Sequence, residues 1–413
     1  MLRQFHKRWQ QLKTRVLLRP VPHTVLSWRF FLPHQDNAVK LQRKVFLNAW
    51  PTLPRPAWVL IAIYSTTTWI CFFSWLQLFR AFSRHSRKLK SQWGIPRYRQ
   101  FRDLLRLTFL HFIPASHYYQ YSLFNQPGRI WLHYVYTFQL AQWHPVMAIN
   151  ASSESMRLLG YKHDFSGYMQ KAGLPAIKTI AFIKKGQILT PANLFTRQSL
   201  FLKPDTGNQK KGCFELHYLA NNEQYRLLTP EPLTNNSDIL DFLNQQILQQ
   251  DYLIQPLLSN HPDISAMFKT DSLITLRLVT GICQNQLMAL FATLERPVDD
   301  KPDYVWPLVI DIQTGAILND ADKHYCRSEQ RSSVVNQFAG QVIPHWQQSV
   351  DIALSAHQQL RDVPTIGWDL VICPDGIFIL EGNAGWAIAS HQNWVSMPLL
   401  SSILEKVYLD LQK

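Results

Sequence analysis

Acidic residues are almost missing from the first third of this 413-residue chain. Residues 1–149 hold 21 Lys and Arg against 2 Asp and Glu, whereas the remaining residues hold 21 against 26. The excess behind the formal net charge of +14 therefore belongs to the N-terminal third. Such a split favours a segment that faces a polyanion or a membrane, joined to an ordinary globular domain.

The cysteine patterns of disulfide frameworks and zinc sites are also missing. The five cysteines are scattered with no C-x-x-C pair, and no His cluster has the spacing of zinc ligands. We therefore expect reduced, mostly buried thiols in a cytosolic compartment. The chain does not open with a short charged segment, an apolar run and a cleavage site, so we predict no cleavable signal peptide. No Ser-His-Asp or Cys-His nucleophile is evident.

Charged side chains are absent from residues 57–79. As a helix this stretch would reach roughly 34 Å, enough to cross a hydrocarbon core of about 30 Å. Trp58, Trp75 and Phe79 lie near its ends, as in the interfacial belt of a spanning helix. The polar cluster at residues 65–68 makes the stretch less apolar than most spans. Two interpretations stay open: a spanning or deep interfacial helix, and a buried core helix.

Lys and Arg are unequally distributed around this stretch. The 20 residues before it hold four and the 20 residues after it hold seven, which predicts that its C-terminal side is cytoplasmic. We therefore expect residues 1–150 to form a basic, membrane-associated helical region, with the catalytic domain at the cytoplasmic face of the membrane. Basic and aromatic residues can also bind single-stranded nucleic acid, but no such motif is present, so we expect no nucleic-acid partner.

The sequence of residues 367–383, GWDLVICPDGIFILEGN, predicts a hairpin because two apolar runs flank a Pro-Asp-Gly turn. Asp369 would begin its first strand, and Glu381 and Asn383 would end its second. Antiparallel pairing would bring the three side chains together. Oxygen ligands suit magnesium, which keeps water and bridges to substrate phosphates. The alternative is an ordinary solvated hairpin with acidic ends.

A second stretch with a candidate binding pattern is SLFLKPDTGNQKKGCFEL, over residues 199–216. An apolar strand places Lys203 at its end, and a polar loop then returns into a second strand. Glycine and lysine in such a loop let backbone N–H groups and ammonium charges approach phosphate oxygens. The spacing is not that of a Walker loop, and an exposed hairpin is the alternative. The residues that suggest a phosphate loop are Gly207, Lys210, Lys211 and Gly212.

The chain has two more informative strands. Residues 251–258 predict a strand that runs into a linker, and residues 274–280 predict a strand with Arg277 at its centre. A buried arginine needs an anionic partner, and a phosphate and a core carboxylate are equally good candidates. We predict a smaller α+β subdomain over residues 151–255 and a larger one over 256–413, with a nucleotide between them.

Taken together, these motifs resemble those of the ATP-grasp superfamily. The runs F-L-K-P, I-Q-P-L, T-L-R-L-V-T and G-W-D-x10-L-E-G-N occur in the order found in that superfamily. A-G-x-x-I-P-x-W at residues 339–346 is similar to its sugar-transfer-associated branch, which is related to alpha-L-glutamate ligases. The resemblance covers residues 155–395. It implies an α/β (α+β) chain with an ATP-grasp fold, in which two α+β subdomains clasp ATP.

The resemblance also implies roles for individual residues. Lys203 resembles the catalytic lysine on the ATP phosphates, Lys162 the lysine on the preceding helix, and residues 207–212 the flexible phosphate loop. Arg277 resembles the catalytic arginine near the γ-phosphate and the acyl phosphate. The remaining matches are a hinge whose backbone meets adenine, at Gln255, Pro256, Leu257 and Leu258, and magnesium ligands at Asp369, Glu381 and Asn383.

The reaction implied by the resemblance joins a carboxylate to an amine or another nucleophile through an acyl phosphate, with consumption of ATP. Lys203 and Arg277 would neutralise charge during phosphoryl transfer, and Mg²⁺ would bridge the phosphates. We expect a role in cell-envelope or polysaccharide biosynthesis, with unknown carboxylate and acceptor substrates that are lipid- or glycan-linked. A kinase and a non-catalytic nucleotide-binding module of a glycan-synthesis complex remain as alternatives.

Overall fold

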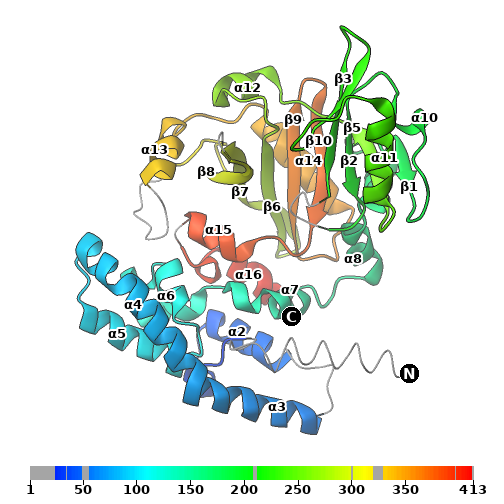
Figure 1. Cartoon of the computed structure of the whole chain (residues 1–413). Helices are drawn as coiled ribbons and strands as arrows, with labels where there is room; N and C mark the ends of the chain where they lie inside the picture. Colours follow the sequence, from blue (N-terminus) through cyan, green and yellow to red (C-terminus); the bar gives the residue numbers. More distant parts are fainter. Residues whose placement is uncertain are drawn as a thin grey trace. The chain divides into compact units, whose positions relative to one another are not determined.

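A computed structural model describes residues 24–33, 35–48, 55–207, 212–298, 301–319, 329–395 and 397–411. The chain divides into two units (Figure 1). The helical unit comprises Met1–Ile149, Asn319–Gln337 and Ala387–Lys413, and the two-sheet unit comprises Asn150–Leu318 and Phe338–Trp386. The boundary between Ile149 and Asn150 lies one residue before the domain boundary that the sequence predicts. Residues 387–413, which we had assigned to the second domain, belong instead to the helical unit.

The helical unit combines the N-terminal helices with those of the two later segments. Its helices are α2 Asn37–Asn48, α3 Arg55–Thr68, α4 Ser74–Trp93, α5 Arg97–Leu105, α6 Ser116–Gln120, α7 Leu140–Met147, α13 Glu329–Gln337, α15 Ile388–Val395 and α16 Ile403–Asp410. Two π-helical turns, η3 Trp69–Phe73 and η4 Arg106–Leu110, extend α3 into α4 and continue α5. Gly94, with φ +67°, ends α4 as a left-handed cap.

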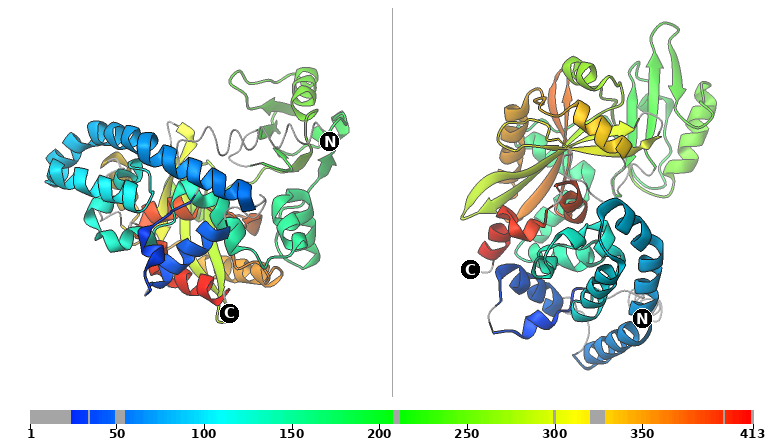
Figure 2. Two further views of the ribbon diagram at one scale, coloured as in Figure 1. Left: turned by 90° about the horizontal axis from the view of Figure 1, so that it is seen from below. Right: turned by 90° about the vertical axis from the view of Figure 1, so that its left-hand side faces the viewer.

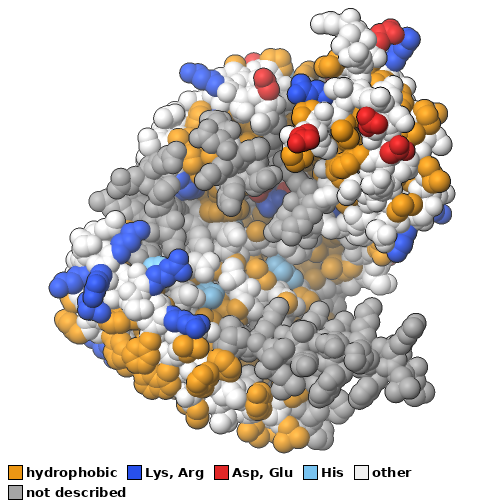
Figure 3. Space-filling model, viewed as in Figure 1, with side chains coloured by type: hydrophobic (Ala, Val, Ile, Leu, Met, Phe, Trp, Pro, Cys, Tyr) orange, Lys and Arg blue, Asp and Glu red, His pale blue; other side chains and the backbone are white. Residues whose placement is uncertain are grey.

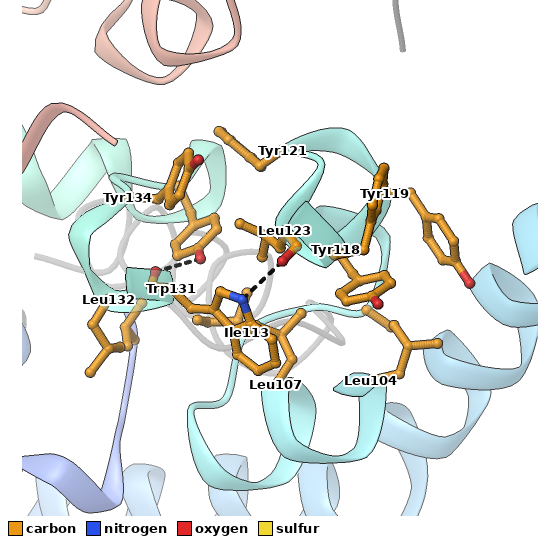
Figure 4. Close-up of a cluster of buried hydrophobic side chains, with 14 of the residues drawn as sticks. Leu104, Leu107, Ile113, Tyr118, Tyr119, Tyr121, Leu123, Trp131, Leu132 and Tyr134 are labelled. Atoms are coloured by element: carbon orange, nitrogen blue, oxygen red, sulfur yellow. Dashed lines mark hydrogen bonds between the residues drawn. The ribbon is translucent and has the colours of Figure 1, made fainter. Parts of the chain in front are cut away.

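Aromatic side chains form the core of the helical unit (Figure 4). Tyr118, Tyr119 and Trp131 are almost completely buried. Their polar atoms find partners, as buried Tyr and Trp require. The Trp131 indole donates to the Leu123 carbonyl at 3.2 Å, and the Tyr118 hydroxyl donates to Asp103 at 3.2 Å.

One continuous helix, Val59–Trp93, is the only one in the described residues that is long and apolar enough to cross a membrane. It joins the C-terminal part of α3 to η3 and α4. Only 11% of its most apolar 18-residue window is buried within the protein. The interpretation of this stretch as a buried core helix therefore does not hold.

The two-sheet unit begins with α8 Ser153–Gly160 and α9 Lys162–Lys171. Its first sheet is antiparallel, with the order β1-β5-β2-β3-β4. Leu200, Leu202 and Ile254 belong to the core beneath α11 Asn236–Ile247. The strands are β1 Ala181–Ile183, β2 Leu200–Pro204, β3 Phe214–Leu219, β4 Gln224–Leu227 and β5 Tyr252–Pro256, and α10 Pro191–Leu194 lies between β1 and β2 in sequence.

The second sheet is also antiparallel, with the order β10-β9-β6-β7-β8 (Figure 2). β9 is buried along its whole length, because it lies between two strands and under α14 Trp346–Gln358. The strands are β6 Thr275–Cys283, β7 Gln286–Val298, β8 Lys301–Ile310, β9 Thr365–Cys373 and β10 Gly376–Asn383, and α12 Pro262–Phe268 precedes β6. A mixed α+β chain with two antiparallel sheets and a helical N-terminal region confirms the predicted fold class.

Candidate active site

The β9–β10 hairpin places two predicted metal ligands opposite each other. Glu381 on β10 pairs in register with Asp369 on β9, after a bulge that follows Ile379. The Asn383 side-chain amide donates to Glu381 Oε1 at 3.1 Å. One detail of the prediction was wrong: Asp369 lies at the centre of β9 and does not begin it. The strand extends further because Thr365 to Ile366 also pair with β6.

Gly382, between Glu381 and Asn383, is required by close packing. A Cβ atom there would lie 2.9 Å from Leu159 Cδ2 of α8 and 2.9 Å from Trp368 Cζ3 of β9. Contacts this short do not occur in folded proteins without displacement of a neighbour. Glycine therefore lets α8 approach the strand that carries Glu381.

Lys162, at the start of α9, links Glu381 to the loop after β2. Its Nζ lies 3.6 Å from Glu381 Oε2 and donates to the Gly207 carbonyl at 2.8 Å. The buried Asp205 fixes the same loop, because its Oδ1 accepts from the His163 backbone N–H at 2.8 Å. A carboxylate at the first turn of a helix also complements the helix dipole.

Lys203 lies at the end of β2, as predicted, with 8% of its surface exposed. Burial lowers the pKa of Lys203 from its ordinary value, and the charge of Lys162 lowers it further. Glu381 has the opposite effect on this pKa. Because a buried ammonium group has lost most of its hydration, an additional anion nearby would stabilise its charged form.

Arg277, on β6, binds carboxylates in the structure. Its Nε and Nη2 donate to the two oxygens of Asp369 at 2.8 and 2.9 Å, and its Nη1 lies 3.1 Å from Glu295 on β7. Of the two partners left open by the sequence, the described residues provide the core carboxylate. Burial opposes the charge, but Asp369 and Glu295 more than offset it, so the pKa of Arg277 is raised.

The two facing carboxyl groups differ in acidity. Burial raises the pKa of Asp369 to about 6, against the opposing effect of Arg277. Burial also disfavours the charge of Glu381, but Lys162, Asn383 and Lys203 outweigh it, so the pKa of Glu381 is lowered. Glu381 is therefore the more readily ionised of the pair.

A cavity of about 330 Å³ opens beside Glu381. We call it the Glu381 cavity. Four of the sequence-predicted residues line it: Lys162, Gly207, Glu381 and Asn383. Lys203, Arg277 and Asp369 do not. The other lining residues come from α8, α9 and the segment after β10: Met156, Leu158, Leu159, Gly160, Phe165, Gly382, Ala384 and Gly385.

The predicted adenine hinge occupies the end of β5 and the residues after it. The Gln255 amide is buried and donates to the Ile177 carbonyl at 3.3 Å. Pro256 pairs with Leu200, the Leu257 N–H donates to the Ser199 carbonyl at 2.9 Å, and Leu258 is half-buried. None of these residues lines the Glu381 cavity.

The predicted phosphate loop is described only at its two ends. Gly207 has φ +115° and Gly212 has φ +75°, a backbone region that favours glycine. The Gly212 carbonyl accepts from the Tyr252 hydroxyl at 3.0 Å. Lys210 and Lys211 lie outside the described residues.

The sequence did not predict two contacts of the candidate site. Glu295 is the second carboxylate on Arg277, and Asp205 attaches the loop after β2 to α9. The available signals were an acid within an apolar strand for Glu295 and an acid two residues after Lys203 for Asp205. A charge in either position must find a partner on folding.

The donor set at the hairpin fits a magnesium ion. Two carboxylates and an amide supply oxygen ligands only, as a hard cation requires. Arg277 uses one lone pair of each Asp369 oxygen, and a carboxylate offers about four such sites. Lone pairs on Asp369 thus remain for a cation.

Comparison with solved structures finds low-similarity matches. An N5-carboxyaminoimidazole synthase from Aspergillus clavatus, in complex with ADP and 5-aminoimidazole ribonucleotide, has 13% identity and a TM-score of 0.34 over 57% of this chain and 46% of its own. A D-alanine-D-alanine ligase from Helicobacter pylori has 9% identity and a TM-score of 0.36, over 62% of this chain and 60% of its own. The D-cycloserine synthetase DcsG has 12% identity and a TM-score of 0.36, over 66% of this chain and 77% of its own. The chain thus spans about half the length of the first of these.

A comparison with curated proteins gives no match. A family model described as sugar-transfer associated ATP-grasp matches residues 146–405, which is more than half of the chain and includes every predicted site residue. The chain belongs to the sugar-transfer associated ATP-grasp family.

Proposed function

We propose that this protein is an ATP- and magnesium-dependent ligase that joins a carboxylate to an amine or another nucleophile through an acyl phosphate. Membership of an ATP-grasp family supports ATP-dependent ligase chemistry in general. The observation that carries the proposal is the pairing of Glu381 with Asp369 across the hairpin, within the electrostatic influence of Lys162, Lys203 and Arg277. In this arrangement the carboxylates can bind a metal ion and the cationic side chains can bind the phosphates of a triphosphate.

Asp369, Glu381 and Asn383 would hold magnesium, which supplies charge neutralisation to the phosphates of ATP. Lys203 and Lys162 would neutralise further phosphate charge from the first sheet and from α9. The γ-phosphoryl group moves to the substrate carboxylate and leaves ADP. An incoming nucleophile then displaces inorganic phosphate from the acyl phosphate. Positioning and electrostatics account for such catalysis, so no side-chain nucleophile is needed.

Arg277 can position Asp369 and still bind a phosphoryl group. A guanidinium has five N–H donors, and Asp369 and Glu295 occupy three of them in the described residues. Two donors remain for an oxygen of the γ-phosphate or of the acyl phosphate. In this proposal Gly207, Lys210, Lys211 and Gly212 cover the phosphates, and residues 255–258 meet adenine.

We also propose that the enzyme acts at the cytoplasmic face of a membrane, on a lipid- or glycan-linked substrate of cell-envelope or polysaccharide biosynthesis. The exposed apolar helix Val59–Trp93 and the sugar-transfer description of the family support this proposal. The excess of basic residues in the N-terminal third also suits the anionic lipids of the cytoplasmic leaflet.

The test is magnesium-dependent release of ADP by the full chain with a panel of carboxylates and amines. We expect Glu381→Gln to abolish ADP formation while its unfolding transition stays close to that of the parent protein. Asp375→Asn is the matched control, because it removes an exposed carboxylate from the turn of the same hairpin and should leave turnover unchanged.

The products distinguish the proposal from its alternatives. A carboxylate-dependent adduct accompanied by ADP and phosphate supports a ligase. Phosphate retained on the acceptor indicates a kinase, and nucleotide binding without ADP indicates a non-catalytic module. Unchanged turnover in Glu381→Gln would contradict the metal assignment.

A further inference from the structure

Large apolar side chains are exposed along α3, η3 and the start of α4. Leu60 has 68% of its surface exposed, Ile63 58%, and Phe72 61%. The apolar surface, as we call it, comprises Val59, Leu60, Ile63, Tyr64, Ile70, Phe72, Trp75, Leu76 and Phe79. Contiguous exposed apolar surface of this kind marks an interaction site. Figure 3 shows apolar side chains gathered on this face of the helical unit, with Lys and Arg side chains along their border.

The packing of this helix does not suit a membrane-spanning orientation. Trp69 is buried and its indole donates to the Thr108 carbonyl at 3.1 Å, and the Trp75 ring lies 4.9 Å from the Phe109 ring. From Trp69 onward the helix is therefore attached to η4 and to the charged helix α5. The part of the helix before Trp69, α3, has 14 residues. It would reach about 21 Å, which is shorter than a hydrocarbon core of about 30 Å.

A basic pocket of about 470 Å³ adjoins the apolar surface. One face of α4 contributes Gln77, Arg80, Ala81, Arg84 and His85, at the spacing i, i+3, i+4, i+7 and i+8. Pro114, Ser116, His117, Thr137 and Phe138 complete the lining. The lining contains hydroxyl, amide and imidazole groups and two guanidinium groups, but no carboxylate.

Arg80 and Arg84 have no ion-pair partner among the described residues. They lie four residues apart on one helix, where like charges repel each other. Burial and the charges of Arg84 and Lys88 lower the pKa of His85, in keeping with uncompensated positive charge at this place. Two neighbouring guanidinium groups are well suited to a phosphate, because their planar N–H forks match its oxygens.

We propose that the basic pocket binds the phosphate-bearing head group of an anionic membrane lipid, while the apolar surface inserts into the outer part of the same bilayer leaflet with the helix parallel to the membrane. The charge of the pocket complements the head group, and the neighbouring apolar residues complement the acyl chains. This inference rests on the proposed membrane association and is independent of the ligase chemistry.

The test is flotation of the full chain with vesicles of phosphatidylcholine alone and of phosphatidylcholine mixed with phosphatidylglycerol. We expect Arg80→Gln/Arg84→Gln to weaken binding to the anionic vesicles by about tenfold or more, because a direct phosphate contact is lost. Arg87→Gln/Lys90→Gln is the matched control. It removes the same charge from exposed positions of α4 outside the pocket, and should weaken binding by about threefold or less because such charges are screened.

Different results would overturn different parts of the proposal. Equal losses of vesicle binding in the two double variants would show that the pocket arginines contribute only as general surface charge. Saturation of the pocket by glycerol phosphate, without a preference for anionic vesicles, would overturn the lipid as its ligand. Absence of binding to any vesicle would contradict the proposed membrane association itself, while leaving the ATP chemistry intact.

The orientation of the helix has its own test. The exposed Asn48 precedes the helix and the exposed Ser91 lies in its last turn, so the two cysteines are introduced by Asn48→Cys and Ser91→Cys. With protein bound to the outside of sealed vesicles, a membrane-impermeant maleimide should label both. Labelling of Ser91→Cys alone would indicate a spanning helix. In addition, Leu60→Ser/Ile63→Ser should weaken binding to both kinds of vesicle, and unchanged binding would exclude insertion of the apolar surface.

Discussion

Two sets of cationic side chains, one in each unit, differ in whether they have acidic partners. In the two-sheet unit Lys162 and Arg277 contact carboxylates, and Lys203 is buried within the influence of Glu381. In the helical unit Arg80 and Arg84 are exposed and make no ion pair among the described residues. A paired, buried charge contributes a fixed geometry, whereas an unpaired one at a pocket is available to an external anion. The comparison therefore predicts that mutations of the two sets affect different properties.

The largest effect on stability is expected for Asp369→Ala. It would leave the partly buried guanidinium of Arg277 with Glu295 as its only carboxylate in the described structure. Breaking a buried ion pair typically costs about 3–5 kcal/mol, and the remaining Glu295 contact favours the lower value. Chemical denaturation measures the change. Asp375→Asn, at the exposed turn, should change the free energy of unfolding by less than about 0.5 kcal/mol.

Lys203→Met separates function from stability. The substitution keeps the apolar stem and removes an ammonium group whose charge is disfavoured by burial. We expect ADP formation to fall by about 100-fold or more, since a positive group near developing phosphate charge is lost. The free energy of unfolding should be unchanged or higher. A large loss of stability with normal turnover would show that Lys203 acts as a structural ion-pair partner instead.

Gly382→Ala tests whether close packing holds the metal hairpin against α8. The added Cβ would displace Leu159 or the Trp368 ring, at a cost of about 1–3 kcal/mol. Gly167→Ala in α9 is the matched control, because nothing lies within 4 Å of its added Cβ. Alanine within a helix should raise stability there by about 0.5–1 kcal/mol. Equal effects of the two substitutions would refute the packing argument.

The smallest effect on stability is expected for Arg80→Gln/Arg84→Gln. Removing two like charges spaced i, i+4 should leave the free energy of unfolding unchanged or raise it by about 0.2–0.5 kcal/mol. Thermal unfolding of the full chain measures this difference. A loss comparable with that of Asp369→Ala would show that the two arginines have buried partners, and the contrast between the units would then disappear.

Local patterns predicted much of the two-sheet unit. The Pro-Asp-Gly turn between two apolar runs identified the hairpin, and two further apolar runs placed Lys203 at the end of β2 and Arg277 within β6. The extent of β9 could not be predicted from this pattern, because its outer residues are stabilised by pairing with β6.

Local sequence patterns could not predict contacts between segments that are distant in sequence. Glu295 reaches Arg277 through the β6–β7 pairing, and the buried Asp205 contacts His163 on α9. Neither the strand register nor the helix position can be read from the few residues around each acid. Likewise, residues 387–413 join the helical unit through contacts such as that between Gln392 and Val135, far apart in sequence.

By itself, the sequence determined the family motifs, the division of charge between the two parts of the chain, and the apolar stretch at residues 57–79. Each of these depends on composition or on spacing within a short segment. Only the tertiary structure decided which partners Arg277 has, which predicted residues share the Glu381 cavity, and which side chains of the apolar helix are exposed. The physical reason is that burial and ion pairing depend on segments that the chain brings together only on folding.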